Sequence, residues 1–415
     1  MILTARLRGI RLVVAATIAT AAVLGAACEK KSESSPAPSA AGTSGGKSAE
    51  AKPPATGGDV IKIGHYGSLT GSKATFGKST DNGIRLAVKE VNAAGGVTIG
   101  GKKFQIELVS DDTEGKKEKA GTVVTKLITK DKVAAVLGEV ASSISLEGAP
   151  VSQEYGVPMI TPSSTNPDVT KVGDMIFRVC FIDPFQGFAC AKFAHDDLKA
   201  AKVAVLFDQA SAYSVGLKDE FNKALKKMGG QIVSEQTYTE GATDFNAQLT
   251  RIRESNPQVI FVPGYYSDIA KIALQARKLG MNMPLLGGDG WDSEDLGKNA
   301  GEAIEGYFYS NHYAPDQPTP AIQTFVAKYK KDFGSTPDGL AALGYDAANI
   351  LFDSMQRAKS PGGKDLRDAI ASTKDFKAVT GTITINAERD AVKPVVIVER
   401  KKGEWVFRAA IEPQK

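Results

Sequence analysis

Cysteine, histidine and tryptophan are scarce in this chain. Its 415 residues include three cysteines, three histidines and two tryptophans. The histidines are scattered and the cysteines form no paired motif, so the sequence has no metal signature. No G-x-S-x-G serine elbow and no dinucleotide-binding glycine motif follows a predicted strand. These absences predict no metal and no cofactor, and they give no argument for an enzyme.

A strong excess of charge is also lacking. The formal net charge is +4, and the first 27 residues contain Arg6, Arg8 and Arg11 but no acid. Without that segment the chain would be close to neutral. The sequence therefore gives no electrostatic argument for binding nucleic acid or an anionic membrane surface.

The apolar run near the N-terminus, Leu12–Ala27, is shorter than the ~20 residues of a membrane-spanning helix. A basic start, this run and a small-residue ending before Cys28 predict a lipoprotein signal peptide over residues 1–28, with lipidation at Cys28. Plain secretion is the alternative. Residues 29–58 are rich in Ser, Ala, Gly, Pro and Lys, so we expect a disordered tether. The protein is then expected in the periplasm or cell envelope, anchored to a membrane by its lipid.

Export leaves the state of Cys180 and Cys190 open. An oxidising compartment permits a disulfide between them. Free cysteine is also commonly buried as a thiol. Both possibilities stand at this point.

Strands alternating with amphipathic helices are what the sequence has in plenty. A first series begins at Val60 and a second near Asp183. This alternation predicts βαβ units and mostly parallel sheets, and the strands are too many for one sheet, so we predict two doubly wound α/β lobes. The main expected strands are 61–64, 104–110, 133–137, 157–160, 175–179, 203–207, 232–238, 259–262, 284–287, 307–310, 381–385, 394–400 and 405–410. The main expected helices are 80–94, 116–130, 215–228, 244–254, 267–279, 320–333 and 340–359.

The stretch Val133–Pro167 carries the first half of a predicted site. Two apolar runs, Val133–Leu137 and Val157–Ile160, read as buried parallel strands, and small hydroxyl residues follow each of them. Ligands bind at the carboxyl ends of strands in open α/β sheets, and hydroxyls beside a helix start suit a carboxylate. Any one hydroxyl is equally consistent with a helix cap or a turn. Their clustering on adjacent strands favours a site at Ser142, Ser143, Ser163, Ser164 and Thr165.

The second series has an acid and aromatic residues at the equivalent edge. Tyr265 and Tyr266 follow one strand, Asp289 follows another, and Asp208 and Tyr213 follow a third. Acids and aromatic rings suit a cation, so the two edges together match a zwitterion such as an α-amino acid. An ordinary loop acid and packing tyrosines are the alternatives.

Six motifs carry a resemblance to a known family: IGHYGSLTGSKATFG, NGIRLAVKEVNAAGGV, ELVSDD, VLGEVASS, VPMITPSSTNPDVT and GYYSD. Together they resemble the periplasmic leucine/isoleucine/valine-binding proteins, the type I solute-binding receptors of branched-chain amino-acid ABC transporters. The resemblance covers Val60 to the C-terminus. It implies two lobes joined by a three-crossing hinge. Lobe 1 would comprise residues 59–182 and 314–385, and lobe 2 residues 183–313 and 386–415.

The resemblance also implies roles for the site residues. Ser142 and Thr165 would hold the ligand carboxylate, together with a backbone N–H group near Ser163. Asp289 and Tyr265 would hold the ammonium group.

The resemblance implies two further ligand contacts, and this sequence also differs from the family near the predicted ammonium site. Tyr213 would contact the ligand from the second lobe, and Phe76 would wall the side-chain pocket. Asp289 is shorter than the glutamate often found at its position, and Trp291 is expected to add bulk near the ammonium end.

The expected function is capture of a small amino acid, branched-chain or similar, by hinge closure. The chain would deliver it to an ABC permease in the inner membrane and act as a monomer. One alternative is a receptor of the same fold for an amide, urea or aromatic acid. Another is a ligand sensor that signals to a partner protein.

Overall fold

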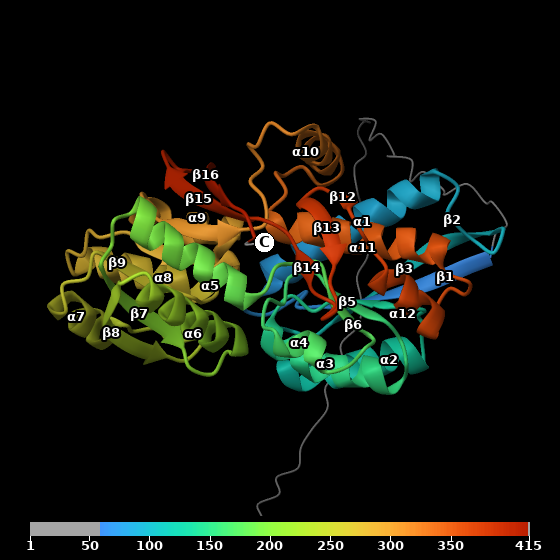
Figure 1. The fold of residues 1–415 in the computed structure, drawn as a ribbon, viewed down its shortest axis with the longest axis horizontal. Helices are drawn as coiled ribbons and strands as arrows, with labels where there is room; N and C mark the ends of the chain where they lie inside the picture. Colours follow the sequence, from blue (N-terminus) through green and yellow to red (C-terminus); the bar gives the residue numbers. More distant parts are fainter. Residues whose placement is uncertain (1–58, 414–415) are drawn as a thin grey trace, which may run out of the picture. The chain divides into compact units, whose positions relative to one another are not determined.

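The structure, a computed structural model, describes residues 59–413 and builds them around two large sheets (Figure 1). The predicted signal peptide, the lipidation at Cys28 and the tether over residues 29–58 lie outside the described residues. Within residues 59–413, no helix combines the length and apolar character that crossing a membrane requires.

The first sheet has six strands in the order β2-β3-β1-β4-β5-β6. Every neighbouring pair is parallel except β2 with β3. Helices α1 (Ala74–Ala93) and α11 (Gly339–Arg357) close an apolar cluster on one face, and α2 (Lys117–Thr129) and α3 (Ser142–Glu154) close another on the opposite face. The strands are β1 (Asp59–Gly67), β2 (Val97–Ile99), β3 (Lys102–Asp112), β4 (Val136–Leu137), β5 (Met159–Thr161) and β6 (Ile176–Arg178).

The second sheet has seven strands in the order β16-β15-β11-β10-β9-β7-β8. Strands β7 to β11 run parallel, whereas β15 and β16 are antiparallel additions at one edge. Helix α5 (Asp183–Lys192) packs on α6 (Ala212–Lys227), and α8 (Tyr266–Lys278) packs on α7 (Asn246–Glu254) and α9 (Glu294–Ala300). The strands are β7 (Lys202–Asp208), β8 (Gln231–Tyr238), β9 (Val259–Val262), β10 (Leu285–Gly287), β11 (Phe308–Asn311), β15 (Val395–Lys401) and β16 (Glu404–Ile411).

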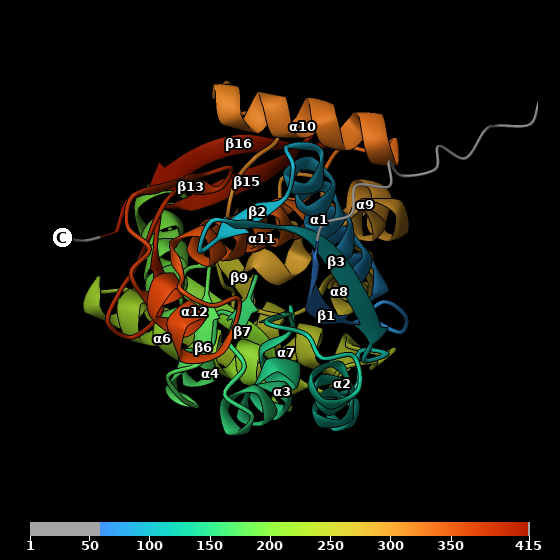
Figure 2. The same cartoon turned by 90° about the vertical axis from the view of Figure 1, so that its right-hand side faces the viewer.

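Smaller elements complete the fold. Helix α10 (Pro320–Phe333) buries its apolar side against α1 and α11, on the outer side of both (Figure 2). A three-stranded antiparallel sheet follows α11. The remaining elements are α4 (Asp168–Lys171), α12 (Gly363–Ala371), β12 (Phe376–Ala378), β13 (Gly381–Ile385) and β14 (Ala391–Val392).

The chain passes between the two large sheets three times. It leaves the first after β6, returns to the helices of the first after β11, and enters the second again between β14 and β15. The prediction of two doubly wound lobes joined by three crossings is therefore confirmed.

Some element boundaries differ from those predicted. Helix α1 begins at Ala74, six residues before the predicted start, because Gly77 inside it lets the helix pass close to the Ser68 backbone. A Cβ atom on Gly77 would lie 2.2 Å from the Ser68 carbonyl oxygen. Strand β4 is shorter than the predicted Val133–Leu137 run. Helices α5, α9 and α12 were not individually predicted.

Candidate functional site

The predicted hydroxyl residues lie at the carboxyl ends of β4 and β5, and all except the half-buried Ser143 are buried. Ser142 is the first residue of α3, and its Oγ accepts the Asn166 N–H at 3.3 Å. The Ser163 hydroxyl donates to the Val140 carbonyl at 3.2 Å. Within residues 59–413, the fully buried hydroxyl of Thr165 makes no hydrogen bond of ordinary geometry, although the Asp183 carboxyl lies near it. Burying a hydroxyl without a partner costs free energy, so this group is suited to a ligand.

Asp289 follows the carboxyl end of β10 in the sequence and is the first residue of the short turn η2 (Asp289–Trp291). Its Oδ1 accepts from the Tyr213 hydroxyl at 2.9 Å and from Gln186 Nε2 at 2.8 Å. Its Oδ2 lies 3.2 Å from His312 Nε2. Burial lowers the pKa of His312 to about 4, so at pH 7 a neutral imidazole donates to this oxygen. A carboxylate has about four acceptor positions, so one remains for a ligand donor.

An aromatic wall adjoins Asp289. The rings of Tyr213 and Tyr265 stack with centroids 5.2 Å apart. Phe76, from α1 of the first lobe, meets Tyr265 edge-on at 5.9 Å and Tyr266 at 4.9 Å. Burial raises the pKa of Tyr213 and of Tyr265, so both hydroxyls stay protonated at pH 7.

The two walls meet across the lobe boundary. The Ala212 N–H donates to Ser143 Oγ at 3.0 Å, and Asn166 Nδ2 donates to the Ala212 carbonyl at 2.9 Å. Ala212 directly precedes Tyr213, whose hydroxyl reaches Asp289. One short series of contacts thus joins the Ser142 side to the Asp289 side.

The seven predicted ligand contacts are therefore all buried around one interlobe region. Two come from the loop after β5, one from the start of α3, one from α1, and three from the second lobe. They are Ser142, Ser163, Thr165, Phe76, Tyr213, Tyr265 and Asp289.

Two other predicted residues, Ser164 and Asp208, bond groups of the protein near their own positions in the chain. The Ser164 hydroxyl bonds Ser145 and the Glu139 carbonyl, so it fixes its own loop. Asp208 accepts the N–H of Ala210 in its own loop. Trp291, expected near the ammonium end, has a fully buried indole that bonds the Val262 carbonyl at 3.0 Å and packs on Gly287 in the core.

Three polar residues of the site region were missed. Gln186 and His312 hold Asp289, and buried Glu139 accepts from Ser68 at 2.5 Å and from the Ala141 N–H at 2.7 Å. Glu139 and His312 each follow a strand of a parallel sheet, which is the signal that found Asp289. Gln186 lies inside α5, and its role depends on tertiary packing alone.

The two cysteines of the described chain are free thiols, so no disulfide joins Cys180 to Cys190. Both are buried, and burial raises the pKa of each thiol to about 12. Among the described residues, no group of three or more metal-binding side chains is present.

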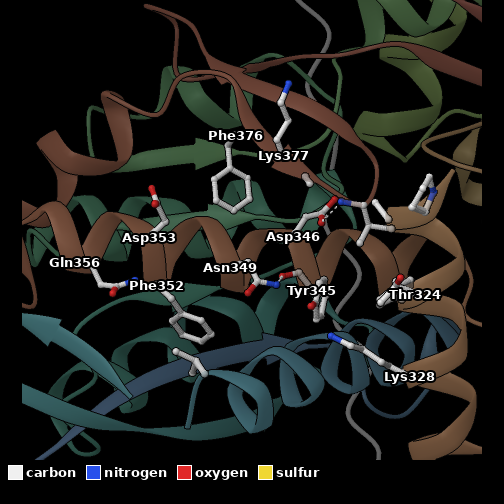
Figure 3. A pocket seen from close by; sticks show the side chains of 16 residues that line it. Thr324, Lys328, Tyr345, Asp346, Asn349, Phe352, Asp353, Gln356, Phe376 and Lys377 are labelled. Carbon is white, nitrogen blue, oxygen red and sulfur yellow. Dashed lines mark hydrogen bonds between the residues drawn. The ribbon is translucent and has the colours of Figure 1, made fainter. Parts of the chain in front are cut away.

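A separate cavity of about 590 Å³ lies beside α10 and α11 (Figure 3). Tyr345, Phe352 and Phe376 line it, together with Asp346. The Asp346 carboxylate already accepts the N–H groups of Val379 and Thr380, at 2.8 and 2.9 Å. None of the predicted site residues lines this cavity, so it is distinct from the interlobe site.

Known proteins share both this sequence and this fold. The family described as periplasmic binding protein matches residues 60–404. The Leu/Ile/Val-binding protein homolog 2 of Brucella abortus is 31% identical over 346 residues, covering 83% of this chain and 91% of that protein. The crystal structure of a leucine binding protein, LivK, from Thermotoga maritima has a TM-score of 0.81 and 40% identity, covering 85% of this chain and 99% of that one.

A second solved structure shows a bound ligand. It is LivJ of Streptococcus pneumoniae, a branched-chain amino acid transporter substrate binding protein in complex with isoleucine. Its TM-score is 0.79 at 34% identity, covering 86% of this chain and all of that one. These matches show that the chain belongs to the periplasmic binding protein family, whose members bind solutes and are not enzymes.

Proposed function

We propose that this protein captures a small amino acid, branched-chain or of similar size, between its lobes and delivers it to an ABC permease in the inner membrane. The observation that carries the proposal is the pairing of two unlike walls. Thr165 offers an unpartnered hydroxyl on one wall, and Asp289 offers a buried carboxylate on the other. Relatives that bind leucine or isoleucine support the same ligand class.

Each end of the amino acid would have its own partners. Ser142 and Thr165 would bind the carboxylate with a backbone N–H near Ser163. Asp289 and the Tyr265 hydroxyl would bind the ammonium group, because charge-assisted hydrogen bonds to an ionised acid are strong.

The ligand's side chain would lie against Phe76 and Tyr213, whose rings stand in the aromatic wall between the lobes. Ligand contacts from both lobes would shift an open–closed equilibrium toward the closed state. The bodies that move are the two lobes proposed from the sequence, residues 59–182 with 314–385 and residues 183–313 with 386–415.

We also propose that the protein works as a monomer anchored through a lipid on Cys28. The small-residue ending before Cys28 supports the anchor. Mass spectrometry of the membrane fraction tests it, since lipidation adds a defined mass to a peptide that begins at Cys28.

An aromatic acid is the second candidate ligand. Phe76, Tyr213, Tyr265 and Tyr266 form a continuous aromatic wall that would stack on a benzoate ring. Such a ligand has no ammonium group, so it would leave Asp289 without its proposed partner.

A thermal-shift screen followed by calorimetry separates these ligands. The panel contains the amino acids, their carboxamides, urea and aromatic acids. A ligand at 100 times its Kd stabilises the folded protein by about 2.7 kcal/mol. We expect branched-chain amino acids to raise the melting temperature and carboxamides to do so much less. Stabilisation by aromatic acids alone would replace the proposal with the second candidate.

Transport and sensing predict different genes next to the gene for this protein. Permease and ATPase genes next to this one support transport, whereas a neighbouring kinase or cyclase gene supports a sensor.

A further inference from the structure

Arg178, the last residue of β6, lies fully buried behind the loop that carries Ser163 and Thr165. Its guanidinium group donates through Nη1 to the Ser164 carbonyl and through Nη2 to the Asn166 carbonyl, the latter at 2.9 Å. One side chain therefore bonds two carbonyl groups of this loop, and it does so from the end of β6, just before the chain leaves the first sheet.

The charge of Arg178 is balanced within the same cluster. Its Nε donates to Asp390 Oδ1 at 2.5 Å. The Thr170 hydroxyl donates to the same oxygen at 2.9 Å and accepts from Nη2 at 3.0 Å. A planar guanidinium group can donate to Asp390, to Thr170 and to the loop carbonyls at the same time. A lysine ammonium group cannot reproduce this forked arrangement of donors.

Peptide planarity transmits this arrangement to Thr165. In a trans peptide the C=O and N–H groups point in opposite directions. The Ser164–Thr165 bond is trans, since the one cis bond of the described chain joins Gly138 to Glu139. The Ser164 carbonyl points at Arg178, so the Thr165 N–H points away from it. No acceptor within residues 59–413 meets this N–H, and the Thr165 hydroxyl makes no hydrogen bond of ordinary geometry there, although the Asp183 carboxyl lies near it.

We infer that Arg178 is a positioning residue that aims the backbone N–H of Thr165 at the ligand carboxylate. Arg178 would thereby set the preference for a carboxylate over a neutral carboxamide. The inference rests on the proposed function, because it requires an amino acid ligand. It adds a residue that never touches the ligand.

The test measures Kd by calorimetry for the best amino acid and for its carboxamide, in the wild type and in Arg178→Lys. The lysine keeps the charge beside Asp390 but loses the fork. We expect affinity for the amino acid to fall about 10- to 100-fold, and affinity for the carboxamide to change by less than about threefold. A purely structural role would weaken both ligands equally.

Arg389→Lys is the matched control. Arg389 also donates to the segment after the loop, at the Thr170 carbonyl 2.9 Å away, but it bonds no carbonyl of residues 163–167. This variant should keep the wild-type ratio of the two affinities. An unchanged ratio in folded Arg178→Lys, or an equal loss for both ligands, would overturn the inference.

An NMR titration of the wild type covers the case in which Arg178→Lys does not fold. The Thr165 amide proton should shift strongly downfield with the amino acid and weakly with the carboxamide, and equal shifts would overturn the inference. A wild type that binds no amino acid at all would instead reject the proposed function.

Discussion

Asp289 is a buried acid surrounded by hydrogen-bond donors of the protein. Tyr213, Gln186 and His312 surround its carboxylate with donors, so the anion is stabilised although it is almost hidden from water. None of the three carries a charge at pH 7, because Gln186 cannot ionise, Tyr213 keeps its proton and His312 is neutral. An ammonium group would therefore be the first full positive charge to reach this acid in the site.

Asp289→Asn should weaken binding of the amino acid by at least about tenfold. The substitution keeps the shape of the side chain but removes the negative charge, and a charge-assisted hydrogen bond contributes roughly 1.5–3 kcal/mol. Calorimetry measures the change. Asp268→Asn is the control, since Asp268 is equally buried in the same lobe but bonds Gly241 and Lys271 instead. Unchanged affinity in Asp289→Asn would reject the ammonium assignment.

Asp183, the first residue of α5, should make stability depend on pH. Burial raises the pKa of its carboxyl group to about 8, against the opposing effect of the Thr165 hydroxyl. The folded protein then keeps a proton that the unfolded chain releases above pH 4. Folding takes up this proton, so the free energy of unfolding falls as pH rises toward 8, by at most about 1.4 kcal/mol per pH unit.

Asp183→Asn removes that dependence. Relative to the wild type, the variant should gain stability progressively between pH 5 and pH 8, as measured by urea denaturation. The exposed Asp197 provides a control, because Asp197→Asn should differ from the wild type by a constant amount. A constant difference for Asp183→Asn as well would show that Asp183 ionises alike in both states.

At the scale of elements, the local sequence pattern predicted most strands and helices. The candidate site was predicted from the polar residues that follow the carboxyl ends of these strands. The predicted range Val259–Val262 matches β9, and Pro320–Phe333 matches α10. The start of α1 could not be predicted, because it depends on the close approach of Ser68 to Gly77 across the fold. Gln186 was missed for a similar reason, since nothing along α5 indicates that its amide reaches Asp289.

Helix α1 contributes an interlobe clamp at its N-terminus. Lys73 lies 2.5 Å from Glu240 of the second lobe, and its ammonium group stands over the Tyr265 ring at 5.0 Å. The Lys73 side chain is 4% exposed and that of Glu240 is 32% exposed, so solvent screens the pair only in part. A contact of this kind favours the closed arrangement and slows its opening.

Lys73→Met should therefore raise the dissociation rate of the ligand, by about three- to tenfold. Methionine keeps much of the apolar stem and removes the charge. Stopped-flow measurement of ligand release checks the rate. Lys78→Met, on the exposed side of the same helix, should leave it unchanged. An equal effect of both substitutions would point to a general change in α1 instead of a clamp.

For the whole molecule, function depends on lobe closure about three crossings. Arg178 lies just before the first crossing and Asp390 just before the third, and they are bonded to each other. The loop that carries Ser163 and Thr165 is thus tied to two of the three crossings. The loop can keep its geometry while the second lobe moves, so ligand binding in the first lobe can precede closure.

Closure can be trapped where Ser143 of the first lobe meets Ala212 of the second. Ser143 Oγ lies 3.0 Å from the Ala212 nitrogen, which limits the separation of the two Cα atoms to about 7 Å, near the upper end of the range that a disulfide spans. The double variant Ser143→Cys with Ala212→Cys should, when oxidised with ligand present, release the ligand at least about tenfold more slowly than its reduced form. Reduction should restore the wild-type rate.

The single variants serve as controls, because neither can form the crosslink. Cys180 and Cys190 are buried free thiols and do not compete for the oxidant. If the oxidised double variant exchanges ligand as fast as its reduced form, then ligand enters and leaves without separation of the lobes at this contact. Hinge opening would then not be the step that controls release.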